Sequence, residues 1–193
     1  MARLPAIVWP VCFGAGMVLC AAAFGQEALT WDALQGAVIE ARIVRDQVVL
    51  RGNRHIPVRF EQDIEIVIGP GDTIQVTSTA TSHGPAGTRR GQRQVSSHTL
   101  ERPRGTRYQG SGHGVWVFDD GTLTFLRTFK DGAIRRTIAI ARAKAGLTCT
   151  ANDGFAREDG VGSVVLDSAV GTGEVAVLSA KQISSSCRIA IKK

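Results

Sequence analysis

Apolar and polar residues alternate along most of the chain from residue 37 onward, in short runs rich in valine, isoleucine and threonine. In one such run Ile64, Ile66 and Ile68 fall on one side, while Asp63 and Glu65 fall on the other. A period of two places alternate side chains on opposite faces of a β-strand. The pattern therefore predicts strands with one face in a core and the other in water.

The runs of this kind are separated by turns rich in glycine, proline and aspartate. The predicted strands are Ala37–Val44, Gln47–Arg51, Asp63–Ile68, Thr73–Thr81, Gly114–Phe118, Thr122–Phe129, Ala133–Ala141, Leu147–Ala151, Gly162–Asp167, Glu174–Ile183 and Cys187–Ile191. The turns Gly69-Pro70-Gly71-Asp72, Asp119-Asp120-Gly121 and Lys130-Asp131-Gly132 each supply a glycine that can adopt a positive φ, as tight hairpins require. Consecutive hairpins imply an antiparallel meander. We expect an all-β fold, either a barrel or a two-layer sandwich, with the barrel preferred because closure removes exposed sheet edges.

The first 25 residues follow a different pattern. They carry a basic residue, Arg3, near the start, continue with an apolar stretch and end with small residues, as a cleaved export signal does. We therefore expect a periplasmic or secreted protein, with residues 26–193 as a single β-rich domain. The polar end of the chain and its short strands favour a soluble protein, with no transmembrane segment after removal of the signal.

A single helical turn is predicted between the export signal and the first strand. Thr30 would cap this turn and Gly36 would end it. Trp31 and Leu34, which lie between them, are the two large apolar residues of the turn. We expect these two side chains to plug one end of the core.

The charge balance is mildly basic, with 23 lysines and arginines against 17 acidic residues and a net charge of +6. The expected signal contains one of the basic residues, Arg3, so its removal leaves a net charge of +5. A net charge of this size is consistent with two interpretations. It either only keeps the protein soluble, or it attracts the protein to anionic polymers or lipids of the cell envelope.

Cys149 and Cys187 are the two cysteines outside the expected signal. In an oxidising compartment, two cysteines on strands most simply form a disulfide. Neither lies in a C-x-x-C pair or beside a histidine, so the pattern does not support a metal-binding or catalytic thiol. A bridge closing a loop of this length would stabilise the fold by about 4 kcal/mol if it acts through chain entropy.

The alternation fades between residues 82 and 113, where glycine, proline, serine and arginine concentrate. We expect a long basic loop here, with one edge strand over Gln94–Leu100. Its arginines are candidate ligand-binding residues, because guanidinium groups match phosphate and carboxylate groups with paired hydrogen bonds. They are Arg89, Arg90, Arg93, Arg102, Arg104 and Arg107. The ligand would be an anionic glycan or lipid, since export disfavours nucleic acid; a merely solvated loop is the alternative interpretation.

Other side chains offer little chemistry. His83, His98 and His113 are too widely spaced for a ligand pair on one strand, so neither a metal site nor a cofactor is predicted. Glu158 and Asp159 lie beside a turn glycine, where adjacent carboxylates point apart and stay solvated. No catalytic signature is complete, and we do not expect an enzyme.

Three aromatic residues have two interpretations. Trp116, Phe118 and Phe125 would line a small ligand cavity if the barrel is wide enough, and would otherwise fill its core.

Several short motifs resemble those of known proteins. They are Leu34-Gln35-Gly36, Phe118-Asp119-Asp120-Gly121-Thr122-Leu123, Gly132-Ala133, Leu147-Thr148-Cys149 and Ser185-Ser186-Cys187. On these motifs the mature chain resembles a group of small secreted bacterial proteins of unknown function. The resemblance implies an exported, β-rich architecture and carries no activity. Taken together, the sequence predicts an exported, non-enzymatic binding module; the alternative is a structural or assembly protein of the cell envelope that acts through protein contacts.

Overall fold

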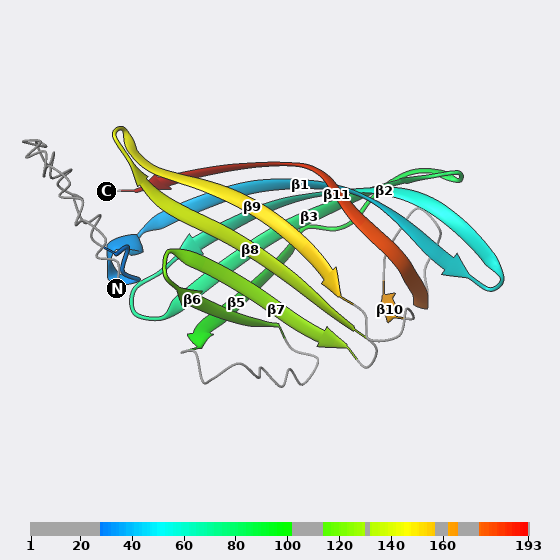
Figure 1. Ribbon diagram of the computed structural model, residues 1–193, viewed down its shortest axis with the longest axis horizontal. Helices are drawn as coiled ribbons and strands as arrows, with labels where there is room; N and C mark the ends of the chain where they lie inside the picture. Colours follow the sequence, from blue (N-terminus) through cyan, green and yellow to red (C-terminus); the bar gives the residue numbers. More distant parts are fainter. Residues whose placement is uncertain (1–27, 102–113, 130–131, 157–161, 166–173, 193) are drawn as a thin grey trace, which may run out of the picture.

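The sheet of this protein is curved into a nearly closed barrel (Figure 1). A computed structural model describes residues 28–101, 114–129, 132–156, 162–165 and 174–192. Within them an 11-stranded sheet and one 3-10 turn, η1 (Asp32–Leu34), account for the regular structure. The all-β prediction is confirmed, and of the two predicted arrangements the barrel is observed. The expected export signal over residues 1–25 lies outside the described residues.

The strands range from 4 residues in β4 and β10 to 18 residues in β11. They are β1 (Ala37–Arg51), β2 (Arg54–Ile68), β3 (Thr73–Gly84), β4 (Gly87–Arg90), β5 (Gln94–Glu101), β6 (Val115–Asp119), β7 (Thr122–Phe129), β8 (Gly132–Ala143), β9 (Gly146–Ala156), β10 (Gly162–Val165) and β11 (Glu174–Ile191).

The order of strands in the sheet is β10-β11-β1-β2-β3-β5-β6-β7-β8-β9, with β4 also paired to β3. Neighbouring strands are antiparallel with one exception. β5 and β6 are parallel and share only two residue pairs, Leu100 with Trp116 and Glu101 with Val117. The prediction of an antiparallel meander is therefore wrong at this junction, because β5 and β6 run in the same direction, whereas strands joined by a hairpin are antiparallel.

Two pairs of predicted strands are each one continuous strand. β1 spans both Ala37–Val44 and Gln47–Arg51, and β11 spans both Glu174–Ile183 and Cys187–Ile191. The pairing register of β1 with β2 is unbroken. The pairing of β1 with β11 shifts by one residue after Val44 and again after Val48, because β11 contains an extra residue at each place. Such bulges let one strand bend around a barrel without ending.

The expected loop over residues 82–113 is wrong for its first part. β3 continues to Gly84, and β4 and β5 pair with β3 as two halves of an antiparallel strand. Between these halves, the amide of Gly91 donates to the carbonyl of Ala80 at 2.8 Å. The predicted strand Gln94–Leu100 is confirmed as β5, but it lies inside the sheet and not at its edge. Residues 102–113 lie outside the described residues.

Apolar side chains fill the end of the barrel nearest to η1. The buried residues of this larger cluster are Leu34, Ala37, Ile39, Ala41, Ile43, Ile64, Ile66, Ile68, Ile74, Trp116, Leu123, Ile138, Ile140 and Ala151. The inward face of Ile64, Ile66 and Ile68 is thus confirmed, since all three are buried.

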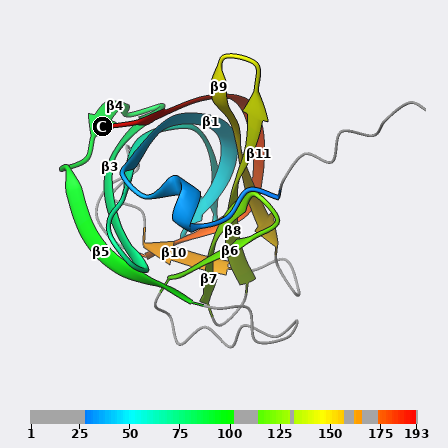
Figure 2. The same ribbon diagram turned by 90° about the vertical axis from the view of Figure 1, so that its left-hand side faces the viewer.

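The turn η1 sits in the mouth of the barrel (Figure 2). Leu34 is fully buried and Trp31 packs against the same cluster, which confirms the predicted plug. Trp31 and not Thr30 is the N-cap residue, and no side chain caps the turn. The expected cap is therefore wrong; the Trp31 indole instead donates to the carbonyl of Gly71 at 2.9 Å and ties the plug to the β2–β3 turn.

Two of the predicted glycine turns have the expected backbone conformation. Gly71 has a φ of +66° and Gly121 a φ of +72°, both in the left-handed region that suits glycine. At Gly121 an added Cβ would also lie 2.9 Å from the carbonyl oxygen of Ile140, so the close approach of β8 excludes larger residues.

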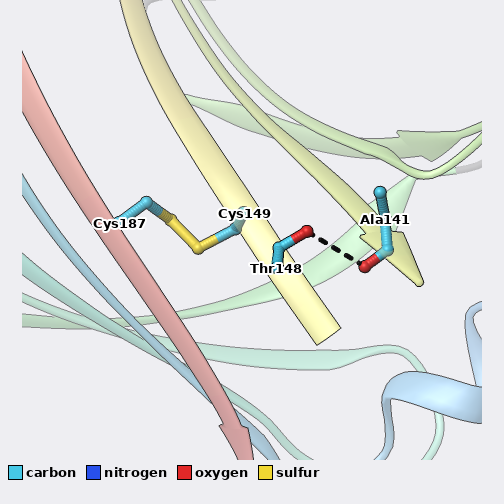
Figure 3. Close-up of a disulfide and its surroundings, with 4 residues drawn as sticks. All are labelled: Ala141, Thr148, Cys149 and Cys187. Carbon is cyan, nitrogen blue, oxygen red and sulfur yellow. Dashed lines mark hydrogen bonds between the residues drawn. A yellow bond between two sulfur atoms is a disulfide. The ribbon is translucent and has the colours of Figure 1, made fainter. Parts of the chain in front are cut away.

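A seam closes the barrel between β9 and β11. Within the described residues no backbone ladder joins these two strands, yet the disulfide Cys149–Cys187 bridges them (Figure 3). The Cα atoms of the two cysteines are 5.5 Å apart. The predicted disulfide is confirmed.

Candidate functional site

A layer of polar side chains crosses the lumen of the barrel between two apolar clusters. The smaller cluster consists of Val49, Val58, Phe60 and Val177. The polar layer contains Arg45 from β1, Gln62 from β2, Arg136 from β8, Asp153 from β9 and Gln182 from β11. Four of them share the parity of the buried apolar residues on their own strands, and Gln182 lies directly opposite Arg45 in the ladder of β1 and β11, so all five project inward.

Asp153 is the centre of this layer. Its Oδ1 accepts from Arg136 Nε at 2.7 Å, and its Oδ2 accepts from Arg136 Nη2 at 2.8 Å and from Arg45 Nη1 at 2.9 Å. The side chain of Asp153 is 3% exposed, against 8% for Arg136 and 12% for Arg45. Two guanidinium groups therefore share one buried carboxylate.

The remaining contacts of the two arginines are with uncharged groups. Arg136 Nη2 donates to Gln62 Oε1 at 2.8 Å, and the guanidinium carbon of Arg45 lies 4.3 Å from the centre of the Phe60 ring. Burial lowers the pKa of Arg45; the charge of Asp153 acts in the opposite direction, and the charge of Arg136 lowers it further. Within the described side chains, the layer carries one more positive than negative charge.

A groove of about 400 Å³ lies on the outer side of β11, β1, β2 and β3. It is lined by the basic residues Arg42, Arg93 and Arg188, the acidic residues Glu40, Asp63 and Glu65, and hydroxyls that include Thr77, Thr79 and Ser186. Arg42 is engaged by Glu61 and lies 3.9 Å from Asp63. Arg188 lies opposite Glu40 in the ladder of β1 and β11. Within the described residues, Arg93 has no ion-pair partner.

Three of the six predicted arginines fall in the described part of the chain, and these three do not share one surface. Arg89 and Arg90 are exposed on β4 opposite Ser82 and Thr81, so they project from opposite faces of the sheet. Arg93 alone of this group lines the outer groove, because it lies in the break between β4 and β5. Arg102, Arg104 and Arg107 lie outside the described residues.

The three aromatic candidates pack against other rings. Trp116 is 2% exposed and lies 4.9 Å from Phe125 between ring centres, while Phe118 lies 5.5 Å from Trp31. All three belong to the larger apolar cluster or pack against it. A cavity-lining role for them stays a prediction.

His83 and His98 lie on different faces of the sheet. His83 bonds to Thr88 Oγ1 at 2.9 Å on the outer side, whereas His98 bonds to Ser96 Oγ at 2.8 Å and packs near Trp116. Burial lowers the pKa of His98. Among the described residues no three potential metal ligands come together. His113, Glu158 and Asp159 fall on parts of the chain that the structure does not describe.

A scan of known protein families and searches of curated proteins and of solved structures returned no match for this chain. Over the described residues, no helix is long and apolar enough to cross a membrane.

Sequence reasoning missed the polar layer. Its signal was present, because Arg45, Gln62 and Asp153 continue the inward parity of Ile43, Ile64 and Ala151. A charged residue at an inward position predicts a buried partner of opposite charge, which here is supplied by other strands.

Proposed function

We propose that this protein is an exported, non-enzymatic binding module whose outer groove takes an anionic glycan of the cell envelope. The observation that carries the proposal is Arg93, which lines the groove without an ion-pair partner among the described residues. A guanidinium group without an ion-pair partner can bind a carboxylate or phosphate group of a ligand through charged hydrogen bonds.

The rest of the groove favours a glycan over a lipid. Its three basic and three acidic residues balance, which suits a polymer with hydroxyls and widely spaced anionic groups better than a dense polyanion. The hydroxyls of Thr77, Thr79 and Ser186 would bond to sugar hydroxyls. Among the described residues that line the groove, only Ala41 and Ile64 are apolar. An acyl chain would therefore find little apolar surface there.

Binding of oligosaccharides from alginate, a carboxylated glycan, to the mature protein tests the proposal, with neutral dextran and phosphatidylglycerol vesicles as comparisons. We expect Arg93→Gln to weaken binding of the carboxylated glycan by about tenfold at low salt, the effect of one lost charged hydrogen bond. Added salt should weaken wild-type binding. The control is Arg142→Gln, which removes an exposed arginine from β8, away from the groove. Equal binding of dextran, or unchanged binding by the Arg93 variant, would contradict the proposal.

The alternative, an envelope assembly protein, requires an apolar contact surface or a free sheet edge. Among the described residues, the large apolar side chains that are exposed are those of Val95, Ile183 and Ile191, which lie on β5 and at two separate places on β11. Scattered apolar residues of this kind are normal on soluble proteins. The edge of β9 is also held beside β11, by the disulfide and by the hydrogen bonds of Gln182. We therefore retain the binding module as the proposed function.

A further inference from the structure

The polar layer of the lumen lacks a counter-charge within the described residues. Arg45 and Arg136 share Asp153, and their other neighbours, Gln62 and the ring of Phe60, carry no charge. Burying a charge without a partner is costly, because the low-polarity interior replaces the hydration shell that the charge has in water. One negative charge placed beside Arg45 would balance the layer.

Two unused hydrogen-bond donors lie at the same place. Arg45 Nε and Gln47 Nε2 are both buried and have no hydrogen-bond partner among the described residues. The two residues are two apart in β1, so their side chains project to the same side of the sheet. Gln47 is 4% exposed, and the Arg45 side chain is 12% exposed.

The described residues around these donors do not satisfy them. Beyond the polar layer, the described part of the lumen contains the apolar side chains of Val49, Val58, Phe60 and Val177, which accept no hydrogen bonds. A bridging water would satisfy the two donors but would leave the excess charge. An anion would accept hydrogen bonds from the two donors and would also balance the excess positive charge.

We propose that the lumen binds a single monovalent anion, a carboxylate or a halide, between Arg45 and Gln47. Arg45 Nε and Gln47 Nε2 donate to it, while Arg45 Nη1 remains on Asp153. The Arg136–Asp153 pair stays neutral and holds Arg45 in place. The site is separate from the outer groove and does not depend on the function proposed for it.

The anion has two chemical sources, a free small ion or the charged end of an amphipathic molecule whose chain packs against the smaller apolar cluster. Thermal unfolding of the mature protein in low-salt buffer, with chloride, acetate or octanoate added separately, distinguishes them. We expect a saturable rise in the melting temperature with at least one of these anions, because a ligand that binds only the folded state stabilises it. Similar affinities for acetate and octanoate indicate a free ion, and tighter binding of octanoate indicates an amphipathic ligand.

Two variants test the assignment of the donors. Arg45→Met removes the excess charge and leaves the Arg136–Asp153 pair balanced, so it should abolish the saturable shift. Gln47→Leu removes one neutral donor, keeps the charge and should weaken anion affinity by about tenfold. It also provides a readout if Arg45→Met does not fold.

Arg54→Met, which removes an exposed arginine at the start of β2, is the matched control and should retain the full shift. The lumen site is wrong if none of the three anions gives a saturable shift, or if Arg45→Met and Gln47→Leu respond as the wild type does. Arg93→Gln should leave the shift unchanged, so failure of the outer-groove proposal can be told apart from failure of this one.

Discussion

At the scale of single residues, two aspartates with the same chemistry have different surroundings. Asp153 binds Arg136 and Arg45 with a side chain that is 3% exposed, whereas Asp46 binds Arg59 Nε at 3.0 Å with a side chain that is 51% exposed. Water already solvates the charges of the exposed pair, so that pair adds little stability. The buried carboxylate of Asp153 pairs with two guanidinium groups. Without it, both positive charges would be buried with no negative charge beside them among the described residues.

Replacing Asp153 with asparagine should therefore destabilise the protein by about 3–5 kcal/mol, since two buried cations lose their only carboxylate among the described residues. Asp46→Asn, its matched control, should cost less than about 1 kcal/mol. Urea unfolding followed by tryptophan fluorescence measures both. Similar losses for the two variants would show that burial does not set the strength of these pairs.

His98 gives stability a pH dependence of predictable sign. Burial lowers its pKa in the folded protein, so the unfolded chain binds the proton more readily as the pH falls through about 6.5. Stability should therefore decrease as the pH is lowered from about 7.5 to about 5.5. His98→Asn should show a smaller decrease, and His55→Asn, at an exposed position, should behave as the wild type does. Urea midpoints at the two pH values provide the measurement, and parallel behaviour of all three proteins would exclude His98 as the source.

At the scale of elements, β9 and β11 are joined by side chains where neighbouring strands normally share a ladder. The carboxamide of Gln182 accepts from the amide of Asp153 at 2.7 Å and donates to the carbonyl of Ala151 at 3.4 Å. It thus takes the place that a backbone peptide group would have in a paired strand. The disulfide Cys149–Cys187 joins the same two strands nearer to the end of the barrel that contains η1.

Gln182→Ala should cost about 1–3 kcal/mol, because it leaves the partly buried amide of Asp153 without its partner. Amide hydrogen exchange at Asp153 should accelerate, while exchange in the continuous ladder of β1 and β2 should change little. Gln75→Ala, which truncates an exposed glutamine on β3, is the control and should have almost no effect. If Asp153 exchanges at the wild-type rate in the Gln182 variant, this side chain does not close the seam.

At the scale of the whole molecule, the order of strands brings the late strands β9 and β11 to the two sides of one seam. The cysteines are 38 residues apart in the sequence, and their bond joins two strands that are not neighbours in any ladder of the described residues. A bridge of this kind restricts the unfolded chain and also holds the curved sheet closed.

The double variant Cys149→Ser/Cys187→Ser should lose about 4 kcal/mol of unfolding free energy, because the unfolded chain regains the freedom that a closed loop lacks. Denaturant midpoints before and after reduction measure the loss, with the reduced wild type expected to match the variant. An unchanged midpoint, with the wild-type bond verified by mass spectrometry, would show that the remaining contacts of the seam are sufficient.

The sequence by itself determined the elements and their inward faces. Alternation located Ile64, Ile66 and Ile68 in the core, the glycine turns located the β2–β3 and β6–β7 hairpins, and the two late cysteines implied the disulfide. Each of these features follows from residues close together in the chain or from a simple pairing rule. The all-β class followed from them.

The tertiary structure alone decided how the polar inward residues meet. Arg45, Gln62 and Asp153 lie where the apolar alternation stops, so the sequence pattern suggested that strands ended there; in the structure β1, β2 and β9 continue through them. Strands can continue because partners from distant parts of the chain compensate the buried charge. The parallel pairing of β5 with β6 and the approach of β9 to β11 are also long-range. Alternation along one strand specifies which face is buried but not which strand will lie beside it, and for that reason only the folded barrel revealed the polar layer.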